Sequence, residues 1–312
     1  METPTKIIFS ASKLKTLQAC SFLYYSKYII GLPDKPNLGA LIGTLIHLIF
    51  EVLSHPRHRK HYDEIIKKYK YSKSIKRFIK KAAKRLNIPL KENQDLINKM
   101  ILTGLQYDFF LENYKNVETE KRIEIEGRNW KLNGFIDKLG VRNDDNNTCL
   151  IRDFKSSKKI DVNEIQALCY SLGMKKLKNM TSIVEFLFLQ FPNNLSHKLQ
   201  FTDEQLNGFE LFLEDIAEKL QDFDEKKACS DFAANDIKKR WLCGKREPTK
   251  NGTIFMCQYR EPFDYFALID ENGKVLKTDF EKKNLKCNVN QFIVKHRFSG
   301  CPAWNNQNNI IL

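Results

Sequence analysis

The chain has 312 residues, 42% of them hydrophobic, so a sizeable core can form and global disorder is excluded. Lysine and arginine number 52 against 38 aspartate and glutamate, an excess that favours polyanionic partners, although a merely basic surface would have the same composition. No apolar run reaches the roughly 18 to 20 residues that cross a bilayer, and residues 1–10 lack an export signal, so we expect a cytoplasmic protein without membrane contact.

Helices are predicted for the first third of the chain. Residues 10–28 and residues 39–53 both carry apolar side chains at three-to-four spacing, which is typical of amphipathic helices. Residues 56–85 are dominated by lysine, arginine and histidine and are expected to form a helical insertion. The basic face of this insertion is either a solvated surface or a track for DNA. A further helix is predicted over residues 93–114.

The hydrophobic period changes from helical to alternating after residue 117. Alternation over residues 123–135, with the turn sequence Glu-Gly-Arg-Asn at its centre, predicts a β-hairpin. A short strand is predicted over residues 149–154. A helix is predicted over residues 161–176, where Asp161 and Glu164 have the spacing of a capping box.

The remaining elements are mixed in type. The apolar run 183–191 is typical of a buried strand, and a long helix is predicted from a capping box at residue 202 to about residue 227. Residues 263–280 carry a hairpin signal around a Glu-Asn-Gly turn. The sequence therefore predicts an α/β protein with a helical basic insertion and a small C-terminal module that bears cysteines.

The central candidate site is the tripeptide Asp153-Phe154-Lys155. Alternate side chains of a strand share a face, so Asp153 and Lys155 can line a cleft while Phe154 packs into the core. Asp137 ends the upstream strand, and pairing of the two strands would bring it beside Asp153. Two close carboxylates repel unless a cation lies between them, and Mg²⁺ prefers such oxygen ligands. Lys155 would then stabilise charge on a phosphate, whereas a surface salt bridge to Asp153 is the alternative.

Three further side chains belong to the predicted site. His47 lies four residues after Gly43 on the helix over 39–53, where it could ligate a metal ion or make a structural hydrogen bond. Gln166 and Tyr170 are also four residues apart and therefore share one face of the helix that follows Lys155. That face could donate hydrogen bonds to a phosphate, although a structural role is the alternative.

The order of these motifs resembles the RecB-like branch of the PD-(D/E)xK nuclease superfamily. The motifs are His47, the Gly-x-x-Asp motif ending at Asp137, Asp153-x-Lys155 and Gln166-x-x-x-Tyr170. The resemblance covers roughly residues 9–175. It extends to CRISPR-associated RecB-like exonucleases with an iron–sulfur cluster and to their viral counterparts. A viral or bacterial source also fits the Lys-rich and Asn-rich composition.

The resemblance implies a restriction-endonuclease-like core, in which a mixed central sheet is flanked by helices. It implies Mg²⁺ or Mn²⁺ held by His47, Asp137, Asp153 and the Phe154 carbonyl, with Lys155, Gln166 and Tyr170 completing the catalytic set. The implied activity is exonucleolytic cleavage of DNA from ends, often single-stranded, in repair, recombination or viral DNA processing. A helicase or recombination protein would be a fitting partner.

The same resemblance implies a [4Fe–4S] cluster bound by one early cysteine and three late ones. Cys20 matches the early ligand, and Cys243, Cys257 and Cys301 are our choice for the late three. The late cysteines of the family are closely clustered, whereas those of this chain are widely spread, so Cys287 remains an alternative to Cys301. Four thiolates would also suit one structural Zn²⁺, and unligated cysteines are the other alternative.

Two domains are expected from these patterns. Residues 1–235 would form the nuclease domain, including the insertion at about 56–115, and residues 236–312 would form a metal-cluster module that closes onto Cys20. The predicted function is a metal-dependent DNA exonuclease. The alternatives are a non-catalytic nucleic-acid-binding subunit and a structure-specific endonuclease of the same superfamily.

Overall fold

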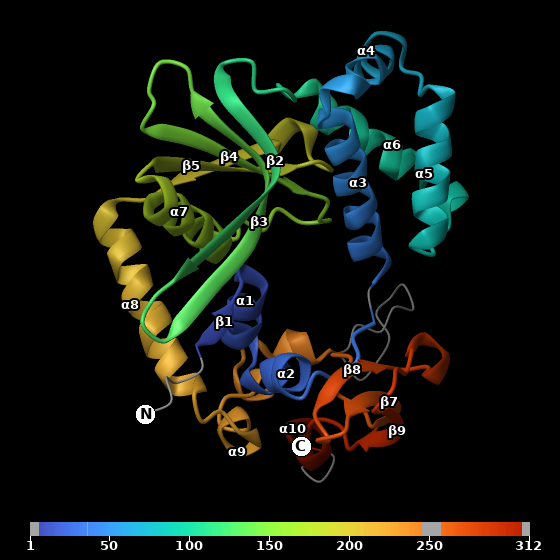
Figure 1. Cartoon of the computed structure of the whole chain (residues 1–312), viewed down its shortest axis with the longest axis vertical. Helices are drawn as coiled ribbons and strands as arrows, with labels where there is room; N and C mark the ends of the chain where they lie inside the picture. The colour runs from blue at the N-terminus through green and yellow to red at the C-terminus, as the bar shows by residue number, and fades with distance from the viewer. Residues whose placement is uncertain (1–5, 36, 245–256, 308–312) are drawn as a thin grey trace. The chain divides into compact units, whose positions relative to one another are not determined.

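The computed structural model describes residues 6–35, 37–244 and 257–307, whose elements are labelled in Figure 1. The chain packs as two compact units. The core unit comprises Met1–Ala11 and Pro36–Glu218, and the cysteine unit comprises Ser12–Lys35 and Lys219–Leu312. An early segment of the chain thus belongs to the same unit as the C-terminal part, while the domain boundary at residue 235 stays a prediction.

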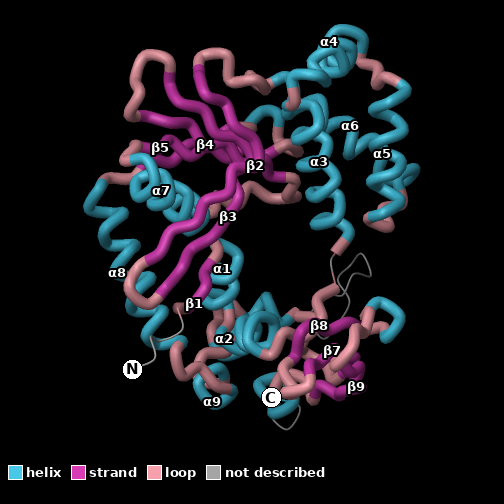
Figure 2. Tube along the Cα trace, viewed as in Figure 1, coloured by secondary structure: helices cyan, strands magenta, loops and turns pink. Residues whose placement is uncertain are grey.

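A mixed sheet of six strands forms the centre of the core unit, within the described residues (Figure 2). The predicted hairpin is confirmed, and β4 runs antiparallel to its second strand, β5 parallel to β4, and β6 antiparallel to β5. A short first strand pairs in parallel with the beginning of β3. The strands are β1 (Ile7–Phe9), β2 (Tyr114–Glu126), β3 (Trp130–Arg142), β4 (Thr148–Lys155), β5 (Thr181–Phe188) and β6 (Ser196–Gln200).

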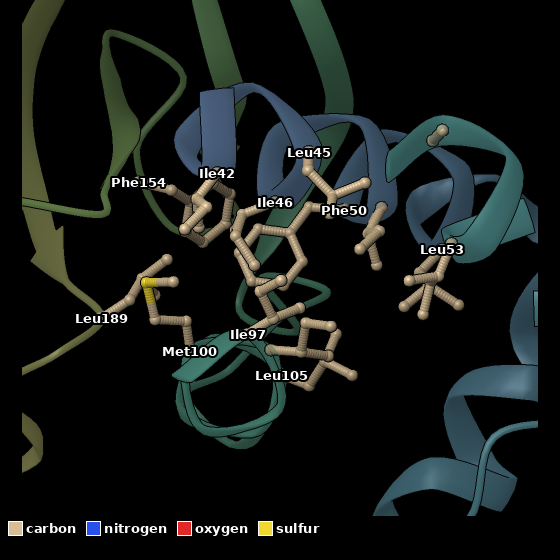
Figure 3. Close-up of a cluster of buried hydrophobic side chains, with 14 of the residues drawn as sticks. Ile42, Leu45, Ile46, Phe50, Leu53, Ile97, Met100, Leu105, Phe154 and Leu189 are labelled. Carbon is tan, nitrogen blue, oxygen red and sulfur yellow. The ribbon is translucent and has the colours of Figure 1, made fainter. Parts of the chain in front are cut away.

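Helices of the predicted insertion and the helix before it cover one face of this sheet. They are α3 (Leu38–Ser54), α4 (Arg59–Lys68, after the short turn η2, Pro56–His58), α5 (Lys73–Arg85) and α6 (Leu90–Gln106). Figure 3 shows Ile46 and Phe50 of α3 meeting Met100 of α6, with Phe154 and Leu189 from the sheet side. Phe154 therefore points into the core, as the strand alternation predicted.

Helix α3 is strongly apolar because it forms the centre of that core. It begins at Asn37, whose side chain accepts a hydrogen bond from the Ala40 amide (2.8 Å) and so caps the helix. Within the described residues, no single helix is both long and apolar enough to cross a membrane. In the same described part of the chain, α3 together with Pro56–Lys68 reaches that length and composition, as a pair bent by 94°.

Helix α7 (Glu164–Lys178) covers the opposite face of the sheet, where Ala167 and Met174 pack against Val184 and Phe186 of β5. The predicted capping box at its start is wrong. The helix begins after Asn163, whose side chain accepts a hydrogen bond from the Gln166 amide (3.2 Å), so the Asp161–Glu164 spacing lies too far upstream.

The second predicted capping box is confirmed at the start of α8 (Asp203–Leu220). The Thr202 amide donates to the Gln205 side-chain oxygen (2.9 Å), and the Gln205 amide donates to the Thr202 hydroxyl (3.3 Å). The helix ends at Leu220 rather than at residue 227. With helices on both faces of a mixed central sheet, the predicted fold class is confirmed.

In the cysteine unit, the helix predicted over residues 10–28 is broken at Cys20, whose backbone is extended (φ −166°, ψ 120°). It becomes α1 (Ala11–Ala19), α2 (Ser21–Tyr24) and the π-helical turn η1 (Tyr25–Ile29). The predicted C-terminal hairpin is confirmed and pairs with a third strand. The other elements are α9 (Glu225–Ala228), β7 (Phe263–Asp270), β8 (Val275–Asp279), β9 (Gln291–Phe298), α10 (Pro302–Gln307) and the short turns η4 (Ala233–Asn235), η5 (Arg240–Cys243) and η6 (Lys282–Asn284).

Candidate active site

The two predicted aspartates lie where strands β3 and β4 separate. The last paired residues there are Lys138 and Arg152, so Asp137 and Asp153 occupy the next position on each strand. The Asp137 carboxylate accepts a hydrogen bond from the Phe154 backbone amide (2.7 Å). Both side chains are largely buried, with 11% of Asp137 and 5% of Asp153 exposed. The point where the two strands separate therefore holds two carboxylates with little access to water, and Asp137 lies within β3 rather than at the end of that strand as predicted.

Asp153 is the centre of a network with three other predicted residues. The Lys155 ammonium lies 2.7 Å from its Oδ2, and the Gln166 amide donates to its Oδ1 (2.7 Å). Gln166 also accepts a hydrogen bond from Lys155 (2.7 Å), and the Tyr170 hydroxyl lies 3.1 Å from Asp153 Oδ1. Burial raises the pKa of Asp153, and Asp137 adds to this, while Lys155 opposes both.

His47 reaches the same place from helix α3. Its Nδ1 lies 3.1 Å from Asp137 Oδ1. Burial lowers the pKa of His47, but the charge and hydrogen bond of Asp137 raise it to about 9 overall. Gly43, one turn earlier, allows α3 to approach the segment after β4, because a Cβ there would lie 2.6 Å from Ser156 Oγ.

Glu120 on β2 completes a group that sequence analysis missed. Ligand atoms of His47, Glu120 and Asp137 all lie within 4.8 Å of one another, so these side chains could hold a metal ion. Burial raises the pKa of Glu120, and the charge of Asp137 adds to that effect. The two carboxylates suit Mg²⁺ or Mn²⁺, which prefer oxygen ligands, whereas His47 would have to lose its ring proton to ligate the ion.

The hairpin register contained the signal for Glu120. The turn pairs Glu126 with Lys131, and counting back from the turn places residue 120 opposite Asp137. The residues on either side pair regularly, but Glu120 itself has the left-handed backbone conformation, with φ 50°. That conformation is uncommon for a residue with a side chain and clusters at functional sites.

The predicted metal-binding residues are thus distributed over two neighbouring groups. His47 and Asp137 lie together with Glu120, whereas Asp153 is bound by Lys155, Gln166 and Tyr170 beside them. Phe154 contributes its amide to Asp137, and its ring packs 4.5 Å from that of Phe50.

Four cysteines converge in the cysteine unit. One cavity, otherwise lined mainly by apolar side chains such as Phe22 and Phe232, is bordered by the four cysteines chosen from the sequence: Cys20, Cys243, Cys257 and Cys301. Burial raises the pKa of the Cys257 and Cys301 thiols to about 11. Cys287 is exposed and does not line this cavity.

Comparison with known proteins gives a family. The family model of the PD-(D/E)XK nuclease superfamily matches residues 8–248. The solved structure named "Putative exonuclease" from Eubacterium rectale is 13% identical, covers 78% of this chain and 90% of its own, and has a TM-score of 0.43. The structure of SSO0001 is 16% identical, covers 58% of this chain and 84% of its own, and has a TM-score of 0.27. No curated protein matches.

The family match spans the sheet and both helical layers, together with all the residues of the candidate active site. It covers well over half of the chain. This chain therefore belongs to the PD-(D/E)XK nuclease superfamily.

Proposed function

We propose that this nuclease is a Mg²⁺- or Mn²⁺-dependent DNA exonuclease of the RecB-like branch. The observation that carries the proposal is the convergence of His47, Glu120 and Asp137 beside the Asp153–Lys155 pair. His47, Glu120 and Asp137 would hold the cation, with Asp153 and the Phe154 carbonyl as further oxygen donors. A divalent cation there would polarise the scissile phosphate and acidify a water molecule.

The chain's own residues have separate roles in this proposal. The Lys155 ammonium is fixed by Asp153 and Gln166, so it is preorganised to stabilise negative charge that develops on the phosphate. The side chains of Gln166 and Tyr170 form hydrogen bonds with Asp153 instead of pointing into a cleft. The Tyr170 hydroxyl also lies 2.8 Å from the Phe135 carbonyl oxygen. We therefore assign both a positioning role, in which they orient the carboxylate and the ammonium.

The test compares end-labelled linear DNA with circular single-stranded DNA, with Mg²⁺, with Mn²⁺ and with chelator. Wild type should degrade only the linear DNA and only with a metal ion. Asp137→Asn and Asp153→Ala should lose this activity. The matched control Asp144→Asn, whose side chain is 69% exposed in a loop, should keep it.

Other outcomes would point elsewhere. Equal cleavage by wild type and Asp153→Ala would reject the proposed site. Cleavage of the circle would make the protein an endonuclease of the same superfamily, because a strict exonuclease needs an end. Binding of DNA without cleavage in any divalent metal would favour the non-catalytic binding subunit.

We also propose that Cys20, Cys243, Cys257 and Cys301 bind a [4Fe–4S] cluster, with Zn²⁺ as the alternative. Their position around one cavity supports the proposal, since either metal centre takes four thiolates. Iron and zinc analysis after anaerobic purification decides between the two. Cys257→Ser should lose the metal and Cys287→Ser should keep it, whereas a folded wild type without either metal would contradict both proposals.

A further inference from the structure

Helix α5 has an unusual distribution of charge. It is 13 residues long, has no acidic residue, and exposes all of its cations, which are Lys73, Lys76, Arg77, Lys80, Lys81, Lys84 and Arg85. On the inner side, Ile75, Ile79, Ala82 and Ala83 are buried in the cluster formed with α3 and α6. The helix is therefore fixed by its apolar side, and its basic side is left to the solvent.

The cations of α5 have no acidic partner in the chain, as far as it is described. Like charges four residues apart repel one another, and α5 contains several such pairs, for example Lys76 with Lys80 and Lys80 with Lys84. Helix α8 of the core unit differs from α5 in this respect. On α8, Asp203 pairs with Lys175, Glu210 with Lys176 and Glu218 with Arg128. A bound polyanion would relieve this repulsion, for which the described residues provide no acidic partner.

The outermost cations of α5 form a regular row. Lys73, Arg77, Lys80 and Lys84 lie opposite the buried side, at relative positions 0, 4, 7 and 11 of the helix. At about 1.5 Å per residue the row is about 16 Å long. A nucleic-acid backbone presents its charges at regular short intervals, about one per 3.4 Å of duplex axis for each strand, so the row can meet several phosphates at once.

A groove leads from Lys155 of the candidate active site toward the start of α6, the helix that follows α5 in the chain. It has a volume of about 580 Å³ and is bordered by the start of α3, by Asn93 and Leu96 near the start of α6, and by the segment Lys155–Lys158. Four residues, 86–89, join the end of α5 to the start of α6. A strand that leaves Lys155 through the groove therefore runs toward the start of α6, which this short linker joins to the end of α5.

We propose that α5 is a nucleic-acid-binding surface. It would bind the phosphate backbone of the substrate at a distance from the bond that is cleaved. The groove at Lys155–Lys158 carries the strand between the two places. The course of the strand rests on the proposed function, but binding to α5 does not require cleavage. Binding and cleavage can therefore be tested separately.

The binding test uses a long single-stranded DNA in chelator, with affinity measured over a range of salt concentrations. The neutralised variant combines Lys73→Gln, Arg77→Gln, Lys80→Gln and Lys84→Gln. Gln is a good helix former, and circular dichroism checks the fold. The matched control removes the same charge from exposed lysines of the cysteine unit that have no ion pair among the described residues, through Lys274→Gln, Lys277→Gln, Lys282→Gln and Lys286→Gln.

Neutralising α5 should weaken binding on the order of tenfold. It should also make the plot of log K against log salt less steep, by about 0.7 for each phosphate contact that the variant loses. The control should change both much less. If the fourfold variant fails to fold, the double variant Lys80→Gln/Lys84→Gln should show about half the change in slope. Equal effects of the α5 variant and the control would overturn the inference.

Two further experiments test this inference separately from the proposed function and from the possibility that α5 binds a membrane. The α5 variant should retain cleavage of a short oligonucleotide that spans only the active centre and lose cleavage of long DNA. If wild type cleaves nothing but α5 neutralisation still weakens binding, only the proposed function fails. Loss of binding to phosphatidylserine-containing vesicles with DNA binding intact would assign α5 to a membrane and overturn the inference.

Discussion

Glu120 combines two features that rarely occur together in a strand. Its backbone is left-handed, which costs free energy in any residue with a Cβ, and a carboxylate oxygen of its side chain lies within 4.8 Å of the candidate ligand atoms of His47 and Asp137. The residues directly beside Glu120 pair in register with β3, whereas the other positive-φ residue of this strand, Asn116, lies at the register shift between Lys115 and Glu118. The proposed role of Glu120 as a metal ligand would explain why the position tolerates the strain.

Glu120→Gln should therefore raise the Mn²⁺ concentration needed for cleavage by at least about 10- to 100-fold, the range typical of residues that support a metal ligand. The reason is that an amide is a weaker ligand than a carboxylate and carries no charge. Activity measured over a Mn²⁺ titration gives the result. Glu124→Gln on the same strand, 53% exposed, is the control, and the same metal dependence in both variants would remove Glu120 from the site.

Lys138 is a buried lysine next to Asp137 of the candidate active site. It is 1% exposed, donates a hydrogen bond to the Phe109 carbonyl and lies 3.6 Å from the centre of the Phe109 ring. Burial lowers the pKa of Lys138 from 10.5 to about 7, and the charge of Arg152 adds to this. Keeping the ammonium charged in this place therefore costs stability at neutral and acidic pH.

The pH dependence follows from the sign of that shift. Between about pH 7 and pH 10 the unfolded chain binds the proton and the folded chain does not, so the free energy of unfolding rises with pH by up to about 1.4 kcal/mol per unit. Lys138→Met should lack this rise. Urea unfolding of both proteins at about pH 7, 8 and 9 measures the difference. Parallel pH curves would show that Lys138 stays protonated in the folded protein.

At the scale of elements, the packing of α6 on α3 depends on Gly104. A Cβ at this position would lie 2.4 Å from Phe50 Cζ and 3.1 Å from Leu189 Cδ2, in the middle of the core. At Gly208 on α8, no described residue outside the local helix backbone has an atom within 4 Å of the same position. Both glycines thus have a helical backbone conformation, but only Gly104 lacks space for a Cβ.

Gly104→Ala should lower the free energy of unfolding by about 1 to 2 kcal/mol, because overpacking exceeds the gain in helix propensity. Gly208→Ala should raise it by up to about 1 kcal/mol through propensity alone. Chemical denaturation of the two variants measures both. A stabilised Gly104→Ala would mean that Phe50 moves aside without cost.

Elements with a strong periodic pattern were predictable from the sequence. Helix α3, the β2–β3 hairpin, β4 and the start of α8 all follow from local spacing and turn residues. The break at Cys20 was not predictable in this way, because apolar spacing continues through it. The short strands β1 and β6 were missed because each is fixed by pairing with a longer strand rather than by a pattern of its own.

The residues of the candidate active site likewise divide into those that a local sequence pattern predicts and those that depend on strand pairing. Asp137, Asp153 and Lys155 came from alternation and strand order, and Gln166 with Tyr170 came from helical spacing. Glu120 needed a count across the hairpin. The buried ion pair of Arg152 with Glu185, at 2.8 Å, needed the parallel register of β4 and β5, which no local pattern reveals.

At the scale of the whole molecule, the cysteine unit is built from two segments far apart in the sequence. The Ser21 hydroxyl lies 2.9 Å from the Ala228 carbonyl oxygen, and Phe22 packs against Phe232 and Phe298. Cys20 comes from the early segment and Cys243, Cys257 and Cys301 from the late one. A metal centre at these cysteines would therefore cross-link the two segments of one folding unit.

Cys257→Ser should destabilise this unit selectively, because metal binding contributes directly to folding free energy. Hydrogen exchange should increase in residues 12–35 as well as in the late segment, while β3, β4 and β5 of the core unit keep their protection. Cys287→Ser, a change at an exposed cysteine, should leave exchange unaltered. Faster exchange confined to the neighbourhood of residue 257 would show that the cysteines do not cross-link the two segments.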